Sequence, residues 1–228
     1  YEAGYLSGQI GVDELSSGMV KVPDTQLNVM IVPGIRGVSV AGLNDVVRGE
    51  ETLLAGWLQQ QTDCEAVFCL PGTHSKWIVA REGQVNQLTT FMTGELFELM
   101  RTRSILAPLI DSQAVADSKS DIFCKGLTLA KSAAGLLHQM FAIRAGALTG
   151  QFAKSDILTL LSGVLVGAEC LAVKSIVQNR SVTLMSSGDL KQTYQNAFEH
   201  FGFVFNVADS EQAAQKGLFS IFNQIQQG

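Results

Sequence analysis

The sequence predicts an α/β fold in which parallel strands are covered by helices. Its C-terminal part alternates strand-like and helix-like segments, and strands joined through a helix pair in parallel. Short apolar runs that stop at Pro-Gly pairs predict two further buried strands earlier in the chain. With 228 residues, 46% of them hydrophobic, the chain can fill the core of one large domain or two small ones.

The first quarter of the chain contains one predicted strand and the start of one predicted helix. Residues 14–24 show no regular pattern and indicate a loop, whereas the apolar run 27–32 ends at Pro33-Gly34 and predicts a buried strand. Glycines interrupt residues 37–49, which we expect to form a loop. A helix is predicted to begin at Glu50, because acidic residues in the first turn interact favourably with the helix dipole.

A strand, a polar turn and a hairpin are predicted next. The apolar run 65–70 leads into the polar turn 71–75. Two strand-like segments, 76–80 and 84–90, then flank the pair Glu82-Gly83. This order predicts an antiparallel hairpin directly after a buried strand.

The rest of the chain is mostly helical. A helix is predicted over residues 93–100, followed by a polar surface loop at 108–121. Two further helices are predicted at 126–141 and 156–177, the second with Asp156 at its N-cap position. The alternating tail then consists of 181–185 (strand), 190–201 (helix), 203–207 (strand) and 210–224 (helix).

Charge and composition exclude several classes of protein. The formal net charge is −5 and only 16% of residues are charged, so no basic surplus exists to bind nucleic acid or an anionic membrane. The most apolar stretch, 157–168, is bounded by Asp156 and Glu169 and is too short for a bilayer, so we expect a buried helix and no membrane span. No signal-peptide pattern opens the chain. Four cysteines in apolar contexts indicate reduced core thiols in a cytoplasmic protein; they are Cys64, Cys69, Cys124 and Cys170.

The strongest local motif is the segment 70–77, which reads Leu-Pro-Gly-Thr-His-Ser-Lys-Trp. A tight turn after a buried strand presents successive backbone N–H groups, Gly72 allows a ligand to approach closely, and Thr73 and Ser75 add hydroxyl donors. Together these features suit a phosphate-binding loop, to which His74 would donate a further hydrogen bond. The start of an ordinary hairpin explains the same residues equally well.

Other side chains near this motif have alternative interpretations. Lys76 would neutralise charge during phosphoryl transfer if it faced a cleft, but its alternation with Trp77 equally predicts a solvent-exposed strand face. Cys69 and His74 could form a thiol with its base, although a cysteine within an apolar strand is normally inert packing. The three histidines lie far apart and lack partners at ligand spacing, so the predicted sites include no metal-ligating residues.

A second motif, residues 45–52, places three carboxylates and one arginine at a loop-to-helix junction. A carboxylate here would take the proton from an attacking hydroxyl, and the guanidinium fork of Arg48 suits an anionic substrate. The structural interpretation is that Asp45 caps a turn and pairs with Arg48, while Glu50 and Glu51 favour the helix start. From this motif alone, the structural interpretation is favoured.

Taken in order, the motifs resemble those of the 2-dehydro-3-deoxygalactonokinase family of the actin-like ATPase superfold. The resemblance covers nearly the whole chain and rests on Arg-Gly-Glu-Glu-Thr at 48–52, Pro-Gly-Thr-His-Ser-Lys-Trp at 71–77 and Met-Thr-Gly-Glu-Leu at 92–96. The family implies a two-domain, ribonuclease H-like fold. It also implies a cytoplasmic kinase that uses ATP and Mg²⁺ to phosphorylate 2-dehydro-3-deoxy-D-galactonate at its 6-hydroxyl in galactonate catabolism.

The resemblance also implies roles for individual residues. Glu50 lies where related carbohydrate kinases carry a Gly-Asp pair, so we expect it to be the general base, with Asp45 and Glu51 as alternatives. Arg48, together with Glu51, would bind the sugar acid. The ATP-binding residues would come from two turns, of which the second precedes a predicted helix; they are Gly72, Thr73, His74, Ser75, Ser187 and Gly188.

Two departures from the family pattern affect these expectations. Ser186-Ser187-Gly188 stands where the adenosine-binding turn normally has a Gly-Gly or Gly-Thr pair. The chain begins at Tyr1, without the strand and Asp-Gly-(Ser/Thr) turn that hold the β- and γ-phosphates, so we expect a fragment that cannot phosphorylate by itself. We predict the remainder of the N-terminal domain at 1–57 and the C-terminal domain at 58–228. The alternative function is a non-catalytic actin-like module that binds a nucleotide or a sugar acid, and homo-oligomerisation is left open.

Overall fold

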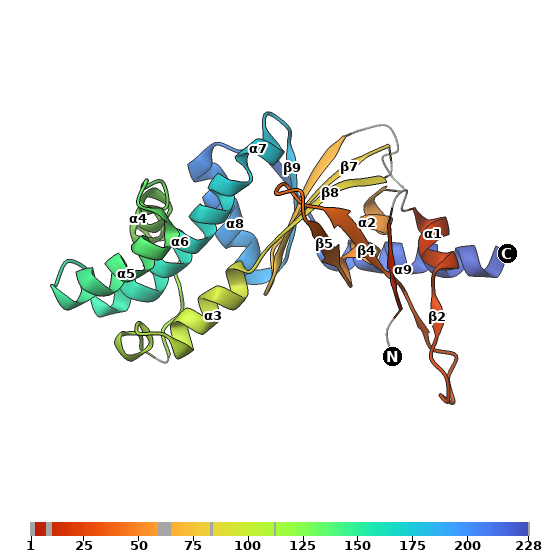
Figure 1. The fold of residues 1–228 in the computed structure, drawn as a ribbon, viewed down its shortest axis with the longest axis horizontal. Coiled ribbons are helices and arrows are strands. Elements are labelled where there is room, and N and C mark those ends of the chain that lie inside the picture. Colours follow the sequence, from red (N-terminus) through yellow and green to blue (C-terminus); the bar gives the residue numbers. More distant parts are fainter. Residues whose placement is uncertain (1–2, 8–10, 59–64, 83, 112, 228) are drawn as a thin grey trace.

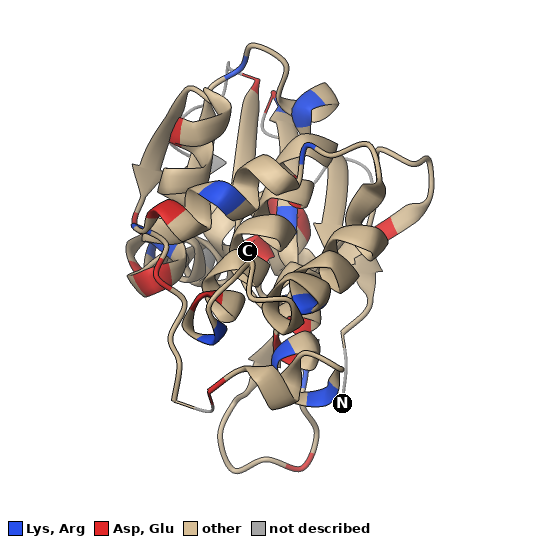
Figure 2. Ribbon diagram, turned by 90° about the vertical axis from the view of Figure 1, so that its left-hand side faces the viewer, with Lys and Arg blue, Asp and Glu red and all other residues tan. Residues whose placement is uncertain are grey.

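A five-stranded sheet lies at the centre of the molecule, with a layer of helices on one side and a smaller unit of strands and helices on the other (Figure 1). The computed structural model describes residues 3–7, 11–58, 65–82, 84–111 and 113–227. Three residues used in the predictions, Tyr1, Cys64 and Gly83, lie outside the described residues. Seen from the side of the helical layer, Lys and Arg are interspersed with Asp and Glu (Figure 2).

The central sheet has the strand order β10-β9-β6-β7-β8. β6, β9 and β10 run parallel, and β7 and β8 continue the sheet as an antiparallel hairpin. This is the predicted ribonuclease H-like arrangement of actin-like ATPases. The strands span Ala66–Leu70 (β6), Ser75–Arg81 (β7), Gln84–Phe91 (β8), Val182–Met185 (β9) and Phe205–Ala208 (β10).

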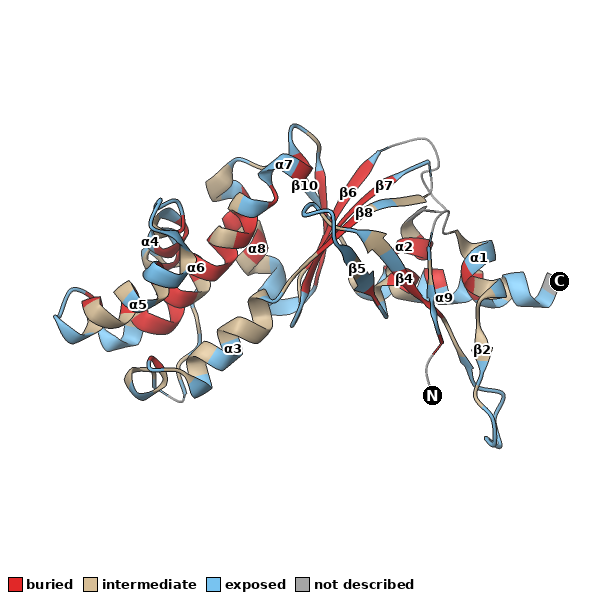
Figure 3. Ribbon diagram, in the orientation of Figure 1, coloured by how far each residue is buried: buried red, intermediate tan, exposed pale blue. Residues whose placement is uncertain are grey.

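The central strands are buried on both faces, which explains their uninterrupted apolar sequences. Along β6, Val67 and Cys69 face the helical layer, whereas Phe68 and Leu70 face the smaller unit. All residues of β6 are buried, and Figure 3 shows β6 and β7 as the buried centre of the molecule. The loop that follows β6 is therefore anchored in the buried centre of the fold.

The helical layer is built around α6 (Ile157–Ala172), which packs against the sheet together with α4 (Asp121–Leu129) and α8 (Gly188–Phe201). The segment Lys154–Ala172 is long and apolar enough to cross a membrane, and 72% of that window is buried inside the protein. The helix is longer than the apolar stretch 157–168, because it continues through Glu169, and the expectation that it is buried is confirmed. The remaining helices of the layer are α3 (Thr93–Arg103), α5 (Gly135–Leu148) and α7 (Lys174–Val177), with short 3-10 turns at Ala107–Leu109 and Lys154–Asp156.

Two expectations about this layer were wrong, and the N-cap expectation was confirmed in position only. The predicted helix at 126–141 is interrupted between α4 and α5, where Gly135 has a φ of +79° and the Gln139 amide donates to two carbonyl oxygens of the connecting turn. Asp156 occupies the N-cap position of α6, but its carboxylate accepts from the Ser155 hydroxyl instead of capping the helix. Cys124 is exposed, so it is not a core thiol.

The smaller unit contains a three-stranded sheet, β1 (Tyr5–Leu6), β4 (Gly34–Val38) and β5 (Asn44–Val47), and a ribbon of β2 (Val20–Lys21) and β3 (Met30–Ile31). The sequence had indicated loops at 14–24 and 37–49. The first segment instead contains α1 (Val12–Ser17) and β2, and the second contains the turn and second strand of the β4–β5 hairpin. The predicted buried strand at 27–32 is reduced to the two residues of β3, and its Leu27 and Met30 are exposed.

Two long helices join the smaller unit to the central sheet. The predicted helix at Glu50 is α2 (Glu50–Leu58), and it crosses the last helix, α9 (Ser210–Gln227). At the crossing, a Cβ atom on Gly56 would lie 2.7 Å from the nitrogen of Gly217, and one on Gly217 would lie 2.9 Å from the nitrogen of Gly56. The two helices therefore meet backbone to backbone.

Candidate active site

A cavity of about 450 Å³ opens where the smaller unit meets the central sheet, and we call it the cleft cavity. Three sequence motifs that are far apart in the chain line it. They contribute residues from the start of α2, from the turn between β6 and β7, and from the turn before α8; these are Arg48 and Glu50, Gly72, Thr73 and His74, and Ser186 and Ser187. The structure thus brings together most of the residues that the sequence had predicted to act jointly.

The turn between β6 and β7, residues 71–74, is fixed by the beginning of α3. The backbone N–H of Glu95 donates to the Thr73 carbonyl oxygen at 2.8 Å, and the Glu95 carboxylate lies 2.6 Å from His74 Nε2. A Cβ atom on Gly72 would meet nothing closer than the His74 carbonyl oxygen, at 3.7 Å, so the Gly72 side of the turn is open. This is the arrangement expected of a loop whose backbone faces a ligand.

The Ser75 hydroxyl does not line the cleft cavity, contrary to prediction. Ser75 is fully buried, and its Oγ donates to Glu169 Oε1 at 2.6 Å on the side of the helical layer. The neighbouring Cys69 is also fully buried, and burial raises the pKa of its thiol well above the usual value. Cys69 is therefore an inert packing residue and not a nucleophile activated by His74.

Glu50 and Lys76 form an ion pair across the cleft cavity. Lys76 is only 8% exposed; its Nζ donates to the His74 carbonyl oxygen at 2.9 Å and lies 3.3 Å from Glu50 Oε1. The interpretation of Lys76 as part of a solvent-exposed strand face was wrong. Glu50 Oε2 is buried and makes no hydrogen bond within the described chain. The carboxylate is thus held by one oxygen while the other remains available to accept a proton or a hydrogen bond.

The two alternative carboxylates have structural partners instead. Asp45 accepts hydrogen bonds from the backbone N–H and the hydroxyl of Thr90, at 2.7 and 2.8 Å, and so ties β5 to β8. Glu51 is buried and accepts from the backbone N–H of Gly49 at 2.6 Å, at the start of α2; burial raises the pKa of this carboxyl group. Both carboxylates stabilise the frame that presents Glu50.

Arg48 lines the cleft cavity, but it does not pair with Asp45 as the sequence had suggested. One of its terminal nitrogens donates to the Ala3 carbonyl oxygen at 2.7 Å, and its guanidinium carbon lies 4.6 Å from the centre of the Tyr5 ring. These contacts hold the positive charge at the edge of the cavity. A guanidinium held in this way can still present its other donors to an anion.

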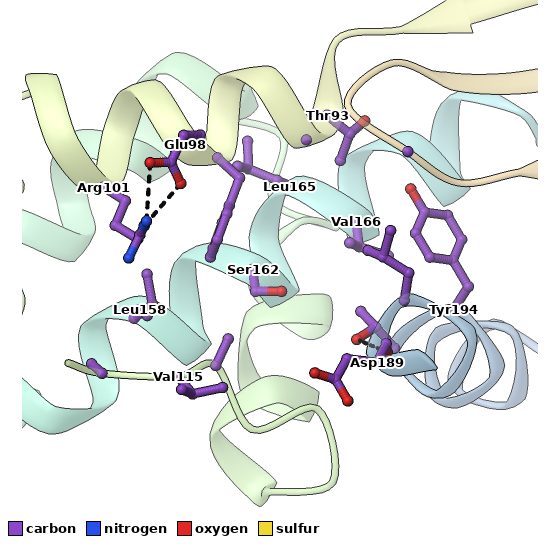
Figure 4. Close-up of a pocket in the computed structure, with 17 residues that line it drawn as sticks. Thr93, Glu98, Arg101, Val115, Leu158, Ser162, Leu165, Val166, Asp189 and Tyr194 are labelled. Atoms are coloured by element: carbon purple, nitrogen blue, oxygen red, sulfur yellow. Dashed lines mark hydrogen bonds and ion pairs between the residues drawn. The ribbon is translucent and has the colours of Figure 1, made fainter. Parts of the chain in front are cut away.

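A second cavity, of about 370 Å³, adjoins the first, and we call it the apolar cavity (Figure 4). Gly72 and Leu190 line both. Most of its wall is apolar and includes Phe97, Leu158, Leu165 and Val166. The ion pair of Glu98 with Arg101 lies at one end and Asp189 at the other (Figure 4). A flat apolar ring fits such a cavity, with polar groups attached to it reaching the loop at Gly72.

The turn before α8 contributes through its shape. Gly188 has a φ of +58°, a conformation that side chains rarely adopt, and this turns the chain from β9 into α8. Ser187 is the N-cap residue of α8 and lines the cleft cavity together with Ser186. The predicted nucleotide-binding turn is therefore at the cavity wall, although serines occupy two of its positions.

One buried carboxylate near the site was missed from the sequence. Glu169 on α6 is 3% exposed and accepts hydrogen bonds from Ser75, Trp77, Thr93 and Tyr194. The signal was present, since a single carboxylate in an otherwise apolar helix must find donors if it is buried. It was interpreted only as the end of the apolar stretch.

Comparisons with known proteins point to one family. A family model described as 2-keto-3-deoxy-galactonokinase matches residues 1–221. The 2-dehydro-3-deoxygalactonokinase of Escherichia coli K12 is 31% identical over 224 residues, which cover 98% of this chain and 74% of that protein. A probable 2-dehydro-3-deoxygalactonokinase of Rhizobium meliloti 1021, DgoK1, is 32% identical over 221 residues, with 95% and 71% covered.

A solved structure agrees with them. The crystal structure of a Sinorhizobium meliloti protein, provisionally described as a 2-dehydro-3-deoxygalactonokinase, matches with a TM-score of 0.89 and 30% identity. The match covers 98% of this chain and 75% of the other. With a family model and two relatives covering nearly its whole length, the chain belongs to the 2-keto-3-deoxy-galactonokinase family.

Proposed function

We propose that the protein is a cytoplasmic kinase that transfers the γ-phosphoryl group of ATP to the 6-hydroxyl of 2-dehydro-3-deoxy-D-galactonate. The family and the names of the relatives support the substrate. The main support for the proposal is the cleft cavity, which is lined both by Glu50, whose Oε2 is buried without a hydrogen bond in the described chain, and by the open loop at Gly72. A proton acceptor next to an anion-binding loop is what phosphoryl transfer to an alcohol requires.

ATP would occupy the two adjoining cavities. The adenine ring would lie between the apolar side chains of α3 and α6, and the phosphates would extend past Gly72 into the cleft cavity. There the backbone N–H groups of Gly72, Thr73 and His74 would stabilise the charge that develops on the transferring phosphoryl group. Ser187 and Gly188 would shape the turn beside the nucleotide.

The sugar acid would enter from the side of the smaller unit. Glu50 would take the proton from the 6-hydroxyl as the new oxygen–phosphorus bond forms and the bond to the β-phosphate breaks, which releases ADP. Lys76 would hold the other oxygen of Glu50 and so aim the carboxylate. Arg48 would pair with the carboxylate of the sugar acid at the cavity edge. Because Asp45 and Glu51 have structural partners, we assign the base to Glu50.

Mg²⁺ would enter as the ATP complex. The described residues contain no group of three or more His, Cys, Asp and Glu side chains arranged to hold a metal ion. Mg²⁺ at phosphoryl-transfer sites usually keeps several waters and is bound through phosphates and one or two carboxylates. The donor set therefore does not form a protein cage for Mg²⁺, and none of the steps assigned to protein residues depends on one.

We further propose a division at the start of α2, with residues 1–57 supplying the base and the sugar-acid side and residues 58–228 supplying the nucleotide side. The C-terminal helix α9 returns to pack on α1 and α2 and so connects the two parts. Membership of a kinase family favours a catalytic function over the alternative, a non-catalytic module that only binds a nucleotide or a sugar acid.

A coupled ADP-release assay on the full-length protein tests the proposal. Glu50→Gln should lower kcat by about 100-fold or more, because general-base catalysis typically contributes factors of that size. Asp45→Asn is the matched control, since it also neutralises a carboxylate of the same motif and should keep kcat within about threefold, the effect of one weakened structural hydrogen bond. Unchanged turnover in Glu50→Gln would remove Glu50 from the mechanism. Sugar-acid binding by calorimetry without any ADP release would favour the non-catalytic module.

A further inference from the structure

Four hydrogen-bond donors converge on the buried Glu169. Its Oε1 accepts from Ser75 Oγ at 2.6 Å and from Trp77 Nε1 at 2.7 Å, and its Oε2 accepts from the Tyr194 hydroxyl at 2.9 Å and from the Thr93 hydroxyl. Both oxygens are therefore fully engaged. The four donors belong to β7, α3 and α8, whereas Glu169 belongs to α6.

The donors lie at the points where these elements meet the two cavities. Ser75 is the first residue of β7, directly after the loop 71–74, and Thr93 is the first residue of α3. The adjoining Gly94 contacts this loop, because a Cβ atom there would lie 2.9 Å from Thr73 Cα. Thr93 and Tyr194 themselves line the apolar cavity, and Figure 4 shows the Tyr194 hydroxyl directed toward Thr93.

A contribution to stability alone is a weak explanation for a buried carboxylate with four hydrogen-bond donors. Removing a carboxylate from water is costly, and apolar residues of similar size often stabilise a core at least as well as a buried charge does. Consistent with that cost, burial raises the pKa of Glu169 even though four donors surround it. What a carboxylate provides and an apolar side chain cannot is direction, because each donor must point at one of its two oxygens.

We propose that Glu169 is a positioning residue for nucleotide binding, which sets the loop 71–74, the start of α3 and α8 in register around the two cavities. This inference rests on the proposed function, since it assigns the loop to phosphate and the apolar cavity to adenine. Glu169 touches neither ligand and acts through Ser75, Thr93 and Tyr194. The sugar-acid side of the cleft, at Arg48, is outside its reach.

Two substitutions in the full-length protein give a graded test. In Glu169→Gln the amide oxygen can still accept from Ser75 and Trp77, and the Thr93 and Tyr194 hydroxyls can rotate to accept from the amide. Glu169→Met removes all four bonds at similar volume. We expect kcat/KM for ATP to fall about tenfold in Glu169→Gln and about 100-fold in Glu169→Met, as small displacements of reacting groups can cost factors of that size.

The matched control is Val173→Ala, four residues after Glu169 at the C-cap of α6. Val173 is fully buried in the same core but makes no hydrogen bond through its side chain, so this substitution lowers stability without touching the network. It should leave the KM for ATP within about twofold of wild type, because a cavity in the core does not redirect the loop. In all variants the KM for the sugar acid should stay unchanged, and this split is a readout that a loss of stability would not produce.

Further outcomes decide between positioning and packing. If Glu169→Met does not fold, Tyr194→Phe removes a single donor and should raise the KM for ATP in the same direction. An unchanged KM for ATP in Glu169→Gln and in Tyr194→Phe would overturn the inference, as would an equal rise in Val173→Ala.

If the wild-type protein transfers no phosphoryl group, the proposed function fails. Hydrogen exchange of the backbone amides of residues 71–75 then tests whether Glu169 positions this loop. Faster exchange in Glu169→Gln but not in Val173→Ala would support positioning, and equal exchange would contradict it.

Discussion

Replacing Gly94 with alanine should displace the loop 71–74, which we propose to bind phosphate, and so impair use of ATP. A Cβ atom at this position would lie 2.9 Å from Thr73 Cα and closer still to the Gly72 carbonyl oxygen, whereas ordinary contacts begin at 3.4 Å. The neighbours are backbone atoms, so the loop must move away from α3 by roughly half an ångström or more. Since a displacement of about 1 Å can cost about 100-fold in rate, we expect kcat/KM for ATP to fall about 10-fold to 100-fold.

The stability of the same variant should change less than its activity. Overpacking costs about 1–3 kcal/mol, but alanine is better than glycine in a helix by up to about 1 kcal/mol, and the two effects partly offset each other. We therefore expect a net loss of about 2 kcal/mol or less. The coupled ADP-release assay at varied ATP measures the first effect, and urea unfolding measures the second.

A matched control separates loop displacement from general strain. Gly146 lies on α5 in the helical core, away from both cavities, and a Cβ atom there would run into the ring of Phe152. Gly146→Ala should lose comparable stability yet keep kcat/KM for ATP within about twofold, because the loop is not among its neighbours. Wild-type kcat/KM for ATP in Gly94→Ala, or an equal loss in Gly146→Ala, would refute the reasoning.

Two other substitutions test the frame around the base. Lys76→Met should lower kcat by about tenfold or more and destabilise the fold by about 1–3 kcal/mol, because it leaves one Glu50 oxygen without its charged partner. ADP release measures the change in kcat, and urea unfolding measures the change in stability. If neither changes, Lys76 has no role in the site. Burial raises the pKa of Glu51 above 4.5, so its contribution to stability is complete below pH 4.5 and is lost as the pH rises through the folded-state value. Glu51→Gln should therefore lose less stability than wild type between pH 4.5 and about 7 in urea unfolding, and an unchanged pH dependence would contradict the assignment.

The sequence predicted the central sheet well because its strands are buried on both faces. The apolar run at β6, the hairpin that follows it and the alternating tail each left a clear pattern, and their boundaries agree with the structure to within a few residues. The β4–β5 hairpin was missed because its strands are short, contain glycines and are polar, as in Asn44-Asp45. Their pairing depends on backbone hydrogen bonds that no side-chain pattern reports.

The candidate site was only partly predictable for a similar reason. Motif order indicated that Glu50 and the loop at Gly72 belong together, and the structure places them in one cavity. Which side of a strand a residue faces was less predictable. Ser75 was assigned to the ligand but is buried against Glu169, and Lys76 was left open between the cleft and solvent but is buried beside Glu50. Glu169 was overlooked because its four donors come from segments up to 94 residues away in sequence.

The crossing of α2 and α9 leaves no room for a side chain at its two glycines. At Gly56 and Gly217 the two helices touch through backbone atoms, and Leu54 of α2 and Ile221 of α9 are buried in the same core cluster. Glu50, the proposed base, lies at the start of one of these helices, and Ser210, at the start of the other, lines the cleft cavity. Any larger residue at either glycine would therefore act as a wedge that forces the two helices apart and displaces Glu50 and Ser210 at the cavity wall.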